Sequence, residues 1–375
     1  MIIKNVYAYT KEHEFCKKDI IICNGRITED TLLYGQKEII DGTGLFAIPG
    51  LVDIHLHGAV GHDFCDADED GLQKIACFEA QNGVLAICPA TMSYPEEVLN
   101  GIIDTAVAHK NRCGADLAGI HLEGPFINPD MAGAQNPKYL AKPDIDMFKR
   151  LQKRAKGLIK LVSIAPELDG AMEFTRLCRD MANISIAHTC ADYEITKKAF
   201  ALGARHMTHL YNAMPGIGHR DPGPVTAAWE QGAEAELIAD GVHIHPAVVR
   251  LTFNVFGPEH IILVSDSMMA CGLSDGQYQL GGQKVNVHGK RAVLAGHPKT
   301  IAGSVTNLFE CMRNAVIDMG IPLEYAVRAA CENPAKAIGI YNDYGSLEPG
   351  HYGNVVLIDK DIHICHIIQK GSILK

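Results

Sequence analysis

The chain has 375 residues, of which 47% are hydrophobic and 21% are charged, and its formal net charge is −10. This length suits a globular protein of one large domain or two ordinary ones with a sizeable core. The acidic balance argues against a nucleic-acid-binding face, although one local arginine or histidine could still hold a phosphate. The first residues, Met1-Ile2-Ile3-Lys4-Asn5-Val6, lack the pattern of a secretory signal, so none is expected. No run of about 18 apolar residues predicts a membrane span.

The 12 cysteines are scattered along the chain, and none of them forms a Cys-x-x-Cys pair. Several, such as Cys23 and Cys88, lie inside apolar runs. This pattern is typical of reduced, buried thiols and predicts a cytoplasmic protein. Neither a cysteine-based zinc site nor a catalytic cysteine has support in the spacing.

Short strand-like pieces separated by polar turns occupy both ends of the chain. In residues 1–47 they are Met1–Tyr9, Asp19–Thr28 and Glu38–Asp41. In residues 345–375 they are Val355–Asp359 and Ile362–Gln369. We expect one small β-sandwich domain built from these two terminal parts and packed beside the rest.

Residues 48–344 carry eight apolar runs, each followed by a helix-like amphipathic segment. Strands that alternate with helices predict parallel βαβ units, and eight in series predict a (β/α)8 barrel of the TIM type. The runs are Leu51–His57, Val84–Thr91, Leu117–Glu123, Ile159–Glu167, Ile184–His188, Arg205–Leu210, Glu236–Gly241 and Ile261–Asp266.

The first run ends in His55 and His57. Side chains two residues apart on a strand point to the same face, so this spacing would aim two imidazoles at one point. Neutral imidazole is a common metal ligand. Taken alone, the pair fits a metal site and two solvent-facing histidines of an edge strand equally well.

Polar residues end four further runs: Glu123, His188, His209 and Asp266. Each alone has an ordinary explanation, since a lone histidine is more often a hydrogen-bonded rim residue and Asp266 could cap a helix. Barrel enzymes, however, carry their chemistry where strands end. Four histidines and two carboxylates at the ends of five strands therefore favour one shared site.

These residue types suit metal-assisted hydrolysis. Imidazole and carboxylate bind Zn²⁺, Fe²⁺ or Mn²⁺. A catalytic metal keeps one position open and lowers the pKa of a bound water towards ~7, so that a hydroxide could attack a carbonyl. Asp266 would take the proton of the attacking water and give it to the leaving amine.

The first run and its flanks, Pro49-Gly50-Leu51-Val52-Asp53-Ile54-His55-Leu56-His57-Gly58, resemble the opening of the amidohydrolase superfamily. Further motifs resemble its N-acetylglucosamine-6-phosphate deacetylase family, and the likeness covers nearly the whole chain. They are His121-Leu122-Glu123-Gly124-Pro125-Phe126, Thr208-His209-Leu210-Tyr211-Asn212-Ala213-Met214-Pro215, Ala239-Asp240-Gly241-Val242-His243 and Asp275-Gly276-Gln277-Tyr278-Gln279-Leu280-Gly281-Gly282.

The resemblance implies how a metal would be held. Glu123, His188 and His209 would bind the principal ion. His55 and His57 would bind a second one, where present, with Glu123 bridging the two. One or two divalent ions are implied, with Zn²⁺ or Fe²⁺ favoured and Mn²⁺ or Co²⁺ as alternatives.

Two further assignments follow from the resemblance. Many superfamily members bridge their metals with a carbamylated lysine from the fourth strand, but Lys160 stands at the wrong end of that run. Glutamate bridging is therefore the consistent choice. Asp266 matches the catalytic aspartate.

The implied reaction is hydrolysis of N-acetylglucosamine 6-phosphate to glucosamine 6-phosphate and acetate, in amino-sugar catabolism and cell-wall recycling. Arg220 matches an arginine that reaches the neighbouring subunit's substrate, which implies a homodimer. Without the resemblance, Arg220 would be interpreted as a solvent-exposed charge in a loop. Gln135 stands where some relatives carry histidine. The substrate-binding residues implied are Ala134, Gln135, Asn212, Ala213, Arg220, His243, Ile301, Ala302 and Gly303.

Three alternatives remain open on the sequence alone. A deacetylase acting on the galactosamine epimer would share nearly every motif. Another amide hydrolase or deaminase of the superfamily would not need the segments after His209 and Asp266. A non-catalytic scaffold would typically have lost metal ligands, and here each ligand position is filled. His245 is expected to be structural.

Overall fold

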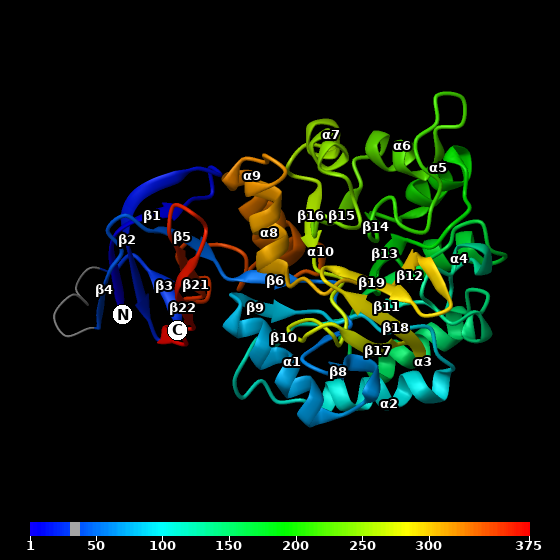
Figure 1. The fold of residues 1–375 in the computed structure, drawn as a ribbon, viewed down its shortest axis with the longest axis horizontal. Coiled ribbons are helices and arrows are strands. Elements are labelled where there is room, and N and C mark those ends of the chain that lie inside the picture. The colour runs from blue at the N-terminus through cyan, green and yellow to red at the C-terminus, as the bar shows by residue number, and fades with distance from the viewer. Residues whose placement is uncertain (31–37) are drawn as a thin grey trace.

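The structure is a computed structural model that describes residues 1–30 and 38–375. A smaller body holds both chain termini, and a larger body of mixed strands and helices holds the middle of the chain (Figure 1). Among the described helices, none is both long and apolar enough to cross a membrane.

The smaller body is built on one sheet with strands from both ends of the chain, as the sequence predicts. β5 joins the two ends, because it pairs parallel with β1 and antiparallel with β21. The strand order is β23-β22-β21-β5-β1-β2-β3, and β4 also pairs with β1. Its closure into a sandwich stays a prediction. The strands are β1 (Ile2–Tyr9), β2 (Phe15–Cys23), β3 (Arg26–Thr28), β4 (Ile39–Asp41), β5 (Phe46–Pro49), β21 (Val355–Ile358), β22 (Ile364–Gln369) and β23 (Ser372–Ile373).

Each of the eight apolar runs overlaps a parallel strand of the larger body, and the run Leu117–Glu123 overlaps two, β10 and β11. The strands are β6 (Leu51–Asp53), β9 (Val84–Ile87), β10 (Asp116–Leu117), β11 (Ile120–Glu123), β12 (Ile159–Ile164), β13 (Asn183–Ile186), β14 (His206–Met207), β15 (Glu234–Ile238) and β16 (Ile261–Val264). Most of their residues are buried, as expected of parallel strands covered on both faces.

These strands form two parallel sheets. β11 to β16 make one continuous sheet in chain order, and β6, β9 and β10 make the other. A bridge between Ala90 and His121 links the two. On the opposite edge, the N–H of Asp266 donates to the carbonyl of His55 over 2.8 Å. The mixed α/β architecture with parallel strands is therefore established. That these strands close into an eight-stranded barrel stays a prediction.

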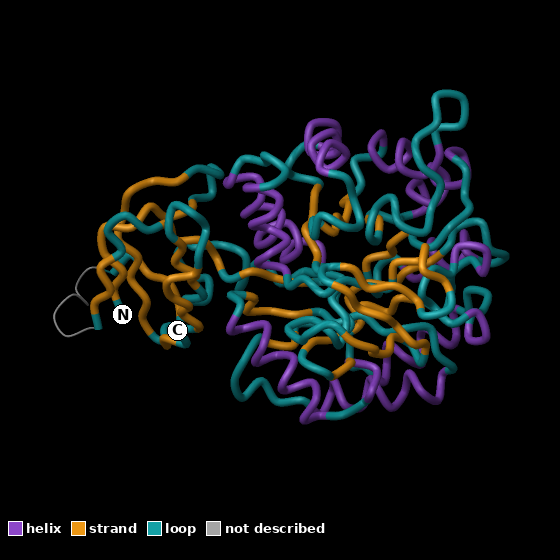
Figure 2. Tube along the Cα trace, in the orientation of Figure 1, coloured by secondary structure: helices purple, strands orange, loops and turns teal. Residues whose placement is uncertain are grey.

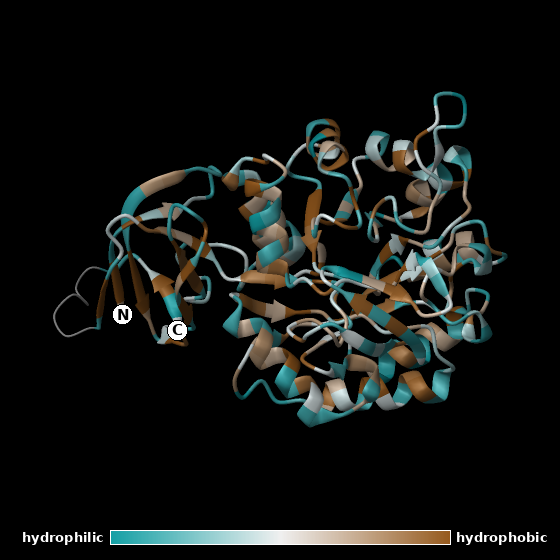
Figure 3. Cartoon of the chain, in the orientation of Figure 1, coloured by the Kyte–Doolittle hydropathy of each residue, from teal (hydrophilic) through white to brown (hydrophobic). Residues whose placement is uncertain are grey.

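Helices lie on the outside of the parallel strands (Figure 2). Several begin at a side-chain cap, such as Asp68 before α1 and Asp192 before α5, as expected of aspartate. Apolar colouring follows the strands, and polar colouring follows the outer helix faces (Figure 3). The helices are α1 (Glu69–Gln81), α2 (Glu96–Ala108), α3 (Ile145–Arg154), α4 (Ala171–Cys178), α5 (Tyr193–Leu202), α6 (Gly223–Glu230), α7 (Pro246–Phe256), α8 (Leu308–Ile317), α9 (Leu323–Val327) and α10 (Asn333–Ala337).

A four-stranded antiparallel sheet lies between β16 and α8. The pattern of alternating strands and helices did not predict it. Its strands are β17 (Gly276–Leu280), β18 (Gln283–His288), β19 (Arg291–Leu294) and β20 (His297–Ile301). Its apolar side chains pack against Met92, Met268 and Ala302. The Gln283 amide donates to the carbonyl of Ala134 over 2.6 Å. The insert is thus fixed beside the loop that carries Ala134 and Gln135.

Candidate metal centre

His55 and His57 do not share a strand face, so the prediction for their local structure is wrong. β6 ends at Asp53, and the two histidines follow it in irregular backbone. Hydrogen bonds to the chain after β16 hold this segment; the N–H of His57 donates to the carbonyl of Ser267 over 2.7 Å. The rings still converge, with centroids 5.4 Å apart, and both residues are buried.

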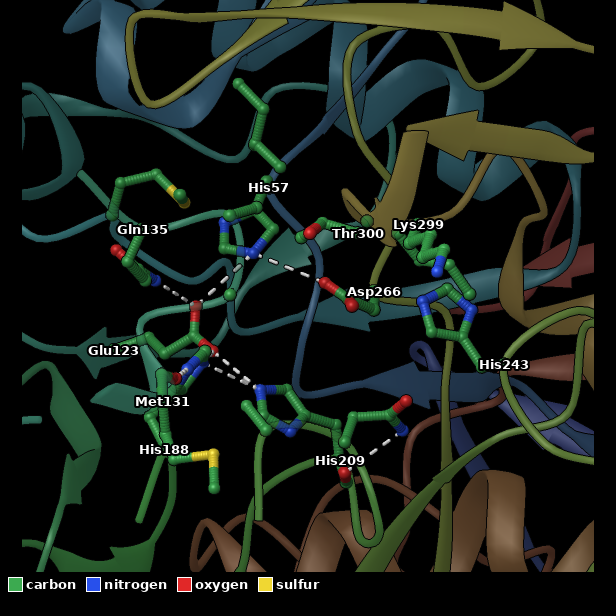
Figure 4. A pocket seen from close by; sticks show the side chains of 18 of the residues that line it. His57, Glu123, Met131, Gln135, His188, His209, His243, Asp266, Lys299 and Thr300 are labelled. Carbon is green, nitrogen blue, oxygen red and sulfur yellow. Dashed lines mark hydrogen bonds and ion pairs between the residues drawn. The ribbon is translucent and has the colours of Figure 1, made fainter. Parts of the chain in front are cut away.

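Three other site residues have left-handed backbone just after a strand ends. The φ angles are 43° at His188, 29° at His209 and 48° at Asp266. Such a conformation costs on the order of 1–3 kcal/mol for a residue other than glycine, and residues that adopt it cluster at functional sites. It turns each of these side chains out of the strand direction, and they meet at one place (Figure 4).

Glu123, His188 and His209 form a close triangle. Glu123 Oε1 lies 3.2 Å from His188 Nε2 and 3.0 Å from His209 Nε2, and the two nitrogens are 3.1 Å apart. The Nδ1–H of His188 donates to the carbonyl of Met131 over 2.7 Å, which leaves Nε2 with a lone pair in the neutral ring. Lone pairs this close repel one another unless a cation lies between them. The donor set therefore fits a metal ion.

His55, like His188, donates a hydrogen bond through Nδ1–H and turns its Nε2 towards Glu123. Its Nδ1–H donates to Glu236 Oε2 over 2.8 Å, and its buried Nε2 has no hydrogen-bond partner among the described residues. That nitrogen lies 3.6 Å from Glu123 Oε1 and 3.7 Å from Asp266 Oδ1. An unpartnered, fully buried nitrogen that faces two carboxylates fits a metal ligand.

His57 completes a second group with His55 and Asp266. Its Nδ1–H donates to the carbonyl of Ala90 over 3.2 Å. Its Nε2 lies 3.3 Å from Asp266 Oδ1 and 3.4 Å from Glu123 Oε2. Glu123 Oε1 thus faces the first group and His55, and Oε2 faces His57, so the carboxylate lies between the two groups as a bridging ligand would.

Without a metal, protons hold the positive charge of this cluster. Burial by itself lowers the pKa of His55, but the carboxylates of Glu236 and Glu123 outweigh burial and raise that pKa well above the ordinary value. Burial raises the pKa of Asp266, but the hydrogen bond with His57 and the charges of nearby histidines lower it to about 2. The pKa of Glu123 is lowered well below its ordinary range for the same reason. Both carboxylates are therefore ionised at neutral pH.

Gln135 supports the metal centre. Its amide nitrogen donates to Glu123 Oε2 over 2.9 Å, and its amide oxygen accepts from the N–H of Ser93 over 2.7 Å. Gln135 as a whole residue is 2% exposed to solvent. These bonds fix the orientation of Glu123, a role that the resemblance did not assign to Gln135.

A cavity of about 320 Å³ opens at this centre. Most of the residues expected to bind metal or substrate line it: His57, Glu123, Ala134, Gln135, His188, His209, Asn212, Ala213, His243, Asp266, Ile301 and Gly303. His55, Ala302 and Arg220 do not line it; His55 and Ala302 are buried, and Arg220 is exposed on the loop before α6.

Polar residues that follow β14 and β15 are held in fixed orientations. The Nδ1–H of His243 donates to Asp240 Oδ2 over 2.8 Å, so its Nε2 is the ring nitrogen left for a ligand. The Asn212 amide nitrogen donates to the carbonyl of His209 over 3.2 Å. His245 caps α7 by accepting from the N–H of Ala247, in line with the structural role expected of it.

Three residues at the site were not predicted from the sequence: Glu236, Lys299 and Thr300. Glu236 lies inside β15, not at its end, and it accepts both from His55 and from the main-chain N–H of His209, over 3.0 Å. A charged residue inside an apolar run was the available signal. Lys299 and Thr300 line the cavity from β20, directly before the expected Ile301.

Comparison with known proteins agrees with this geometry. The profile of the Amidohydrolase family matches residues 46–373. The chain is 36% identical to N-acetylglucosamine-6-phosphate deacetylase of Bacillus subtilis (strain 168), across 100% of this chain and 96% of that protein. It is 33% identical to N-acetylgalactosamine-6-phosphate deacetylase of Escherichia coli O157:H7, across 87% and 86%.

Among solved structures, the chain is likewise similar to N-acetylglucosamine-6-phosphate deacetylases. A mutant N-acetyl-D-glucosamine-6-phosphate deacetylase of Mycobacterium smegmatis, in complex with N-acetyl-D-glucosamine-6-phosphate, superposes with a TM-score of 0.92. It is 31% identical, and the match covers 100% of this chain and 98% of that one. The chain therefore belongs to the amidohydrolase family, within the group that contains the N-acetylglucosamine-6-phosphate deacetylases.

Proposed function

We propose that this protein hydrolyses the acetamido group of N-acetylglucosamine 6-phosphate to give glucosamine 6-phosphate and acetate. The observation that carries the proposal is the meeting of four histidine rings with Glu123 and Asp266 at one end of the parallel strands. The relatives named above, similar over nearly the full chain, support the choice of substrate.

In the proposed site, Glu123, His188 and His209 hold the principal divalent ion. His55 and His57 hold a second where one binds, with Glu123 bridging. Zn²⁺ and Fe²⁺ suit three imidazole or carboxylate ligands best, and Mn²⁺ and Co²⁺ are alternatives. When bound, such an ion supplies Lewis acidity to the amide carbonyl and lowers the pKa of a coordinated water.

Asp266 is the proposed acid and base. Its carboxylate is ionised at neutral pH, so it can accept a proton from the attacking water. The same carboxyl group then delivers that proton to the nitrogen of the leaving amine. His57, 3.3 Å from Asp266 Oδ1, keeps the carboxylate turned towards the reacting centre.

Substrate contacts surround this centre. Ile301 and Gly303 line the cavity and are the proposed acetyl contacts, with Ala302 buried behind them. Asn212, Ala213 and His243 lie where main-chain and ring nitrogens can meet the sugar hydroxyls or the phosphate, and Ala134 and Gln135 close the opposite wall.

A homodimer that shares its active sites is part of the proposal. Arg220 would reach the partner's substrate. An exposed apolar patch lies on the loop that carries Arg220, on α6 and on α7: Ile217, Trp229, Leu251 and Val255, which are 40–58% exposed. These side chains line one apolar hollow between α6 and α7, and such patches mark protein–protein contacts. An Arg220→Ala variant should leave the dimer mass unchanged and weaken substrate binding.

The epimeric substrate, N-acetylgalactosamine 6-phosphate, is the second candidate, because one curated relative at 33% identity is a deacetylase of that sugar. We place the activity in the cytoplasm and in amino-sugar catabolism and cell-wall recycling. The cysteines of the described chain are free thiols, which is consistent with a reducing compartment.

Acetate release from the two sugar phosphates tests the proposal. The protein is treated with a chelator, dialysed, and assayed with and without added Zn²⁺ or Fe²⁺. Metal-dependent release with higher kcat/KM on the glucosamine compound is expected. Release of no acetate from either sugar under any metal would refute the proposed reaction.

A further inference from the structure

The phosphate of the proposed substrate needs a cationic partner at the cavity. Three carboxylate side chains line it, those of Glu123, Asp130 and Asp266. A phosphate monoester carries about −1.5 to −2 charges at pH 7. Among the described residues that line the cavity, Lys299 is the single lysine or arginine.

The ammonium group of Lys299 is available for a ligand. Lys299 is exposed, and within residues 1–30 and 38–375 no hydrogen bond or ion pair engages its side chain. Figure 4 shows it beside His243, across the cavity from Glu123 and Gln135. A lysine ammonium binds phosphate strongly as a compact positive charge.

β20 places Lys299 on the lining of the cavity, two residues before Ile301. The N–H of Ser304 donates to the carbonyl of Asp266 over 2.7 Å, which fixes the end of this segment at the reacting centre. From there the chain runs back through Ile301 to Lys299. At about 3.3 Å per residue of strand, the Cα atoms of Lys299 and Ile301 are roughly 6–7 Å apart along β20.

This displacement matches the shape of the substrate. In a 6-phosphorylated N-acetylhexosamine the acetamido group and the phosphate stand at different ends of the sugar ring. We propose that Lys299 binds the phosphate of the substrate held in its own subunit, and thereby makes the site selective for phosphorylated sugars. This inference rests on the proposed deacetylation, and Lys299 acts in addition to Arg220 of the partner subunit.

The test compares Lys299→Met, which removes the charge, with Lys299→Arg, which keeps it. Lys290→Met is the matched control, because Lys290 is an exposed lysine in the turn between β18 and β19 of the same insert. Lys299→Met should lower kcat/KM on the phosphorylated sugar about 10- to 100-fold, mainly through KM. Activity on unphosphorylated N-acetylglucosamine should stay unchanged, and Lys299→Arg should restore most of the loss.

Calorimetric titration supplies a readout that does not depend on turnover. Glucosamine 6-phosphate should bind the unaltered protein more tightly than glucosamine does, and Lys299→Met should remove most of that difference. Equal losses with both sugars, or no loss with either, would overturn the role of Lys299. Failure of the proposed reaction is a separate result, since the unaltered protein would then release acetate from neither sugar.

Discussion

The two halves of the metal centre differ in how tightly they are built. In the Glu123, His188 and His209 group the ligand atoms lie 3.0–3.2 Å apart. In the His55, His57 and Asp266 group the contacts to the carboxylates are 3.3–3.7 Å.

The origin of the two groups explains the difference. The first comes from β11, β13 and β14 of one continuous sheet, whose strand spacing fixes the ligands. The second joins irregular backbone after β6 to the end of β16. A compact ligand set loses less freedom on binding an ion, so we expect the first half to fill first and the second at higher metal concentration.

The largest expected effect concerns Asp266, which lies in the second half beside His55 and His57. Asp266→Asn should lower kcat about 10²- to 10⁴-fold, because the amide cannot carry the proton from water to the leaving amine. Metal content, measured by elemental analysis, should stay within the range of the unaltered protein. Retained turnover would remove Asp266 from the mechanism.

Ligand removal from each half tests the comparison directly. His188→Ala should abolish binding of the first equivalent of metal, because a lone pair within the close triangle is lost. His57→Ala should leave the first equivalent bound and weaken only the second. Metal titration followed by calorimetry measures both steps. Identical binding curves for the two variants would show that the halves do not differ.

Glu236 should have a smaller effect, since it touches no metal or substrate and acts by orienting His55 and the main chain of His209. Glu236→Gln should weaken metal binding about 10- to 100-fold, as loss of such an orienting partner does. Glu234→Gln, near the start of the same strand, serves as control. Unchanged metal affinity in the Glu236 variant would contradict the orienting role.

The smallest effect is a dependence of stability on pH. In the metal-free protein the raised pKa of His55 stabilises the folded state. This contribution is fully present below the pKa of about 6.5 that histidine has in the unfolded chain, and it is lost as the pH rises through the raised pKa. Metal binding has the opposite dependence, because the ligands must lose their protons. The gain in Tm on adding Zn²⁺ should therefore grow with pH, and a gain that shrinks would exclude the protonated cluster.

Much of this molecule could be predicted from local patterns. The eight apolar runs each hold a parallel strand, because buried parallel strands require continuous apolar sequence. Glu123, His188, His209 and Asp266 could be placed at one site, because parallel strands bring their carboxyl ends to a common edge. The pairing of both termini in one sheet also followed from strand-like pieces at each end.

Only the tertiary structure decided the remaining features. Glu236 belongs to the site through its contacts with His55 and His209, and Lys299 through its place on the cavity lining. No periodicity in the sequence encodes either position. Hydrogen bonds tie the irregular path of His55 and His57 to the chain after β16, and His188 and His209 adopt left-handed backbone where their strands have ended. The sequence by itself determined which ligands are present and the strands that carry them. Packing decided where their ring nitrogens point and which charged side chains line the cavity, because these depend on side chains that meet across the fold.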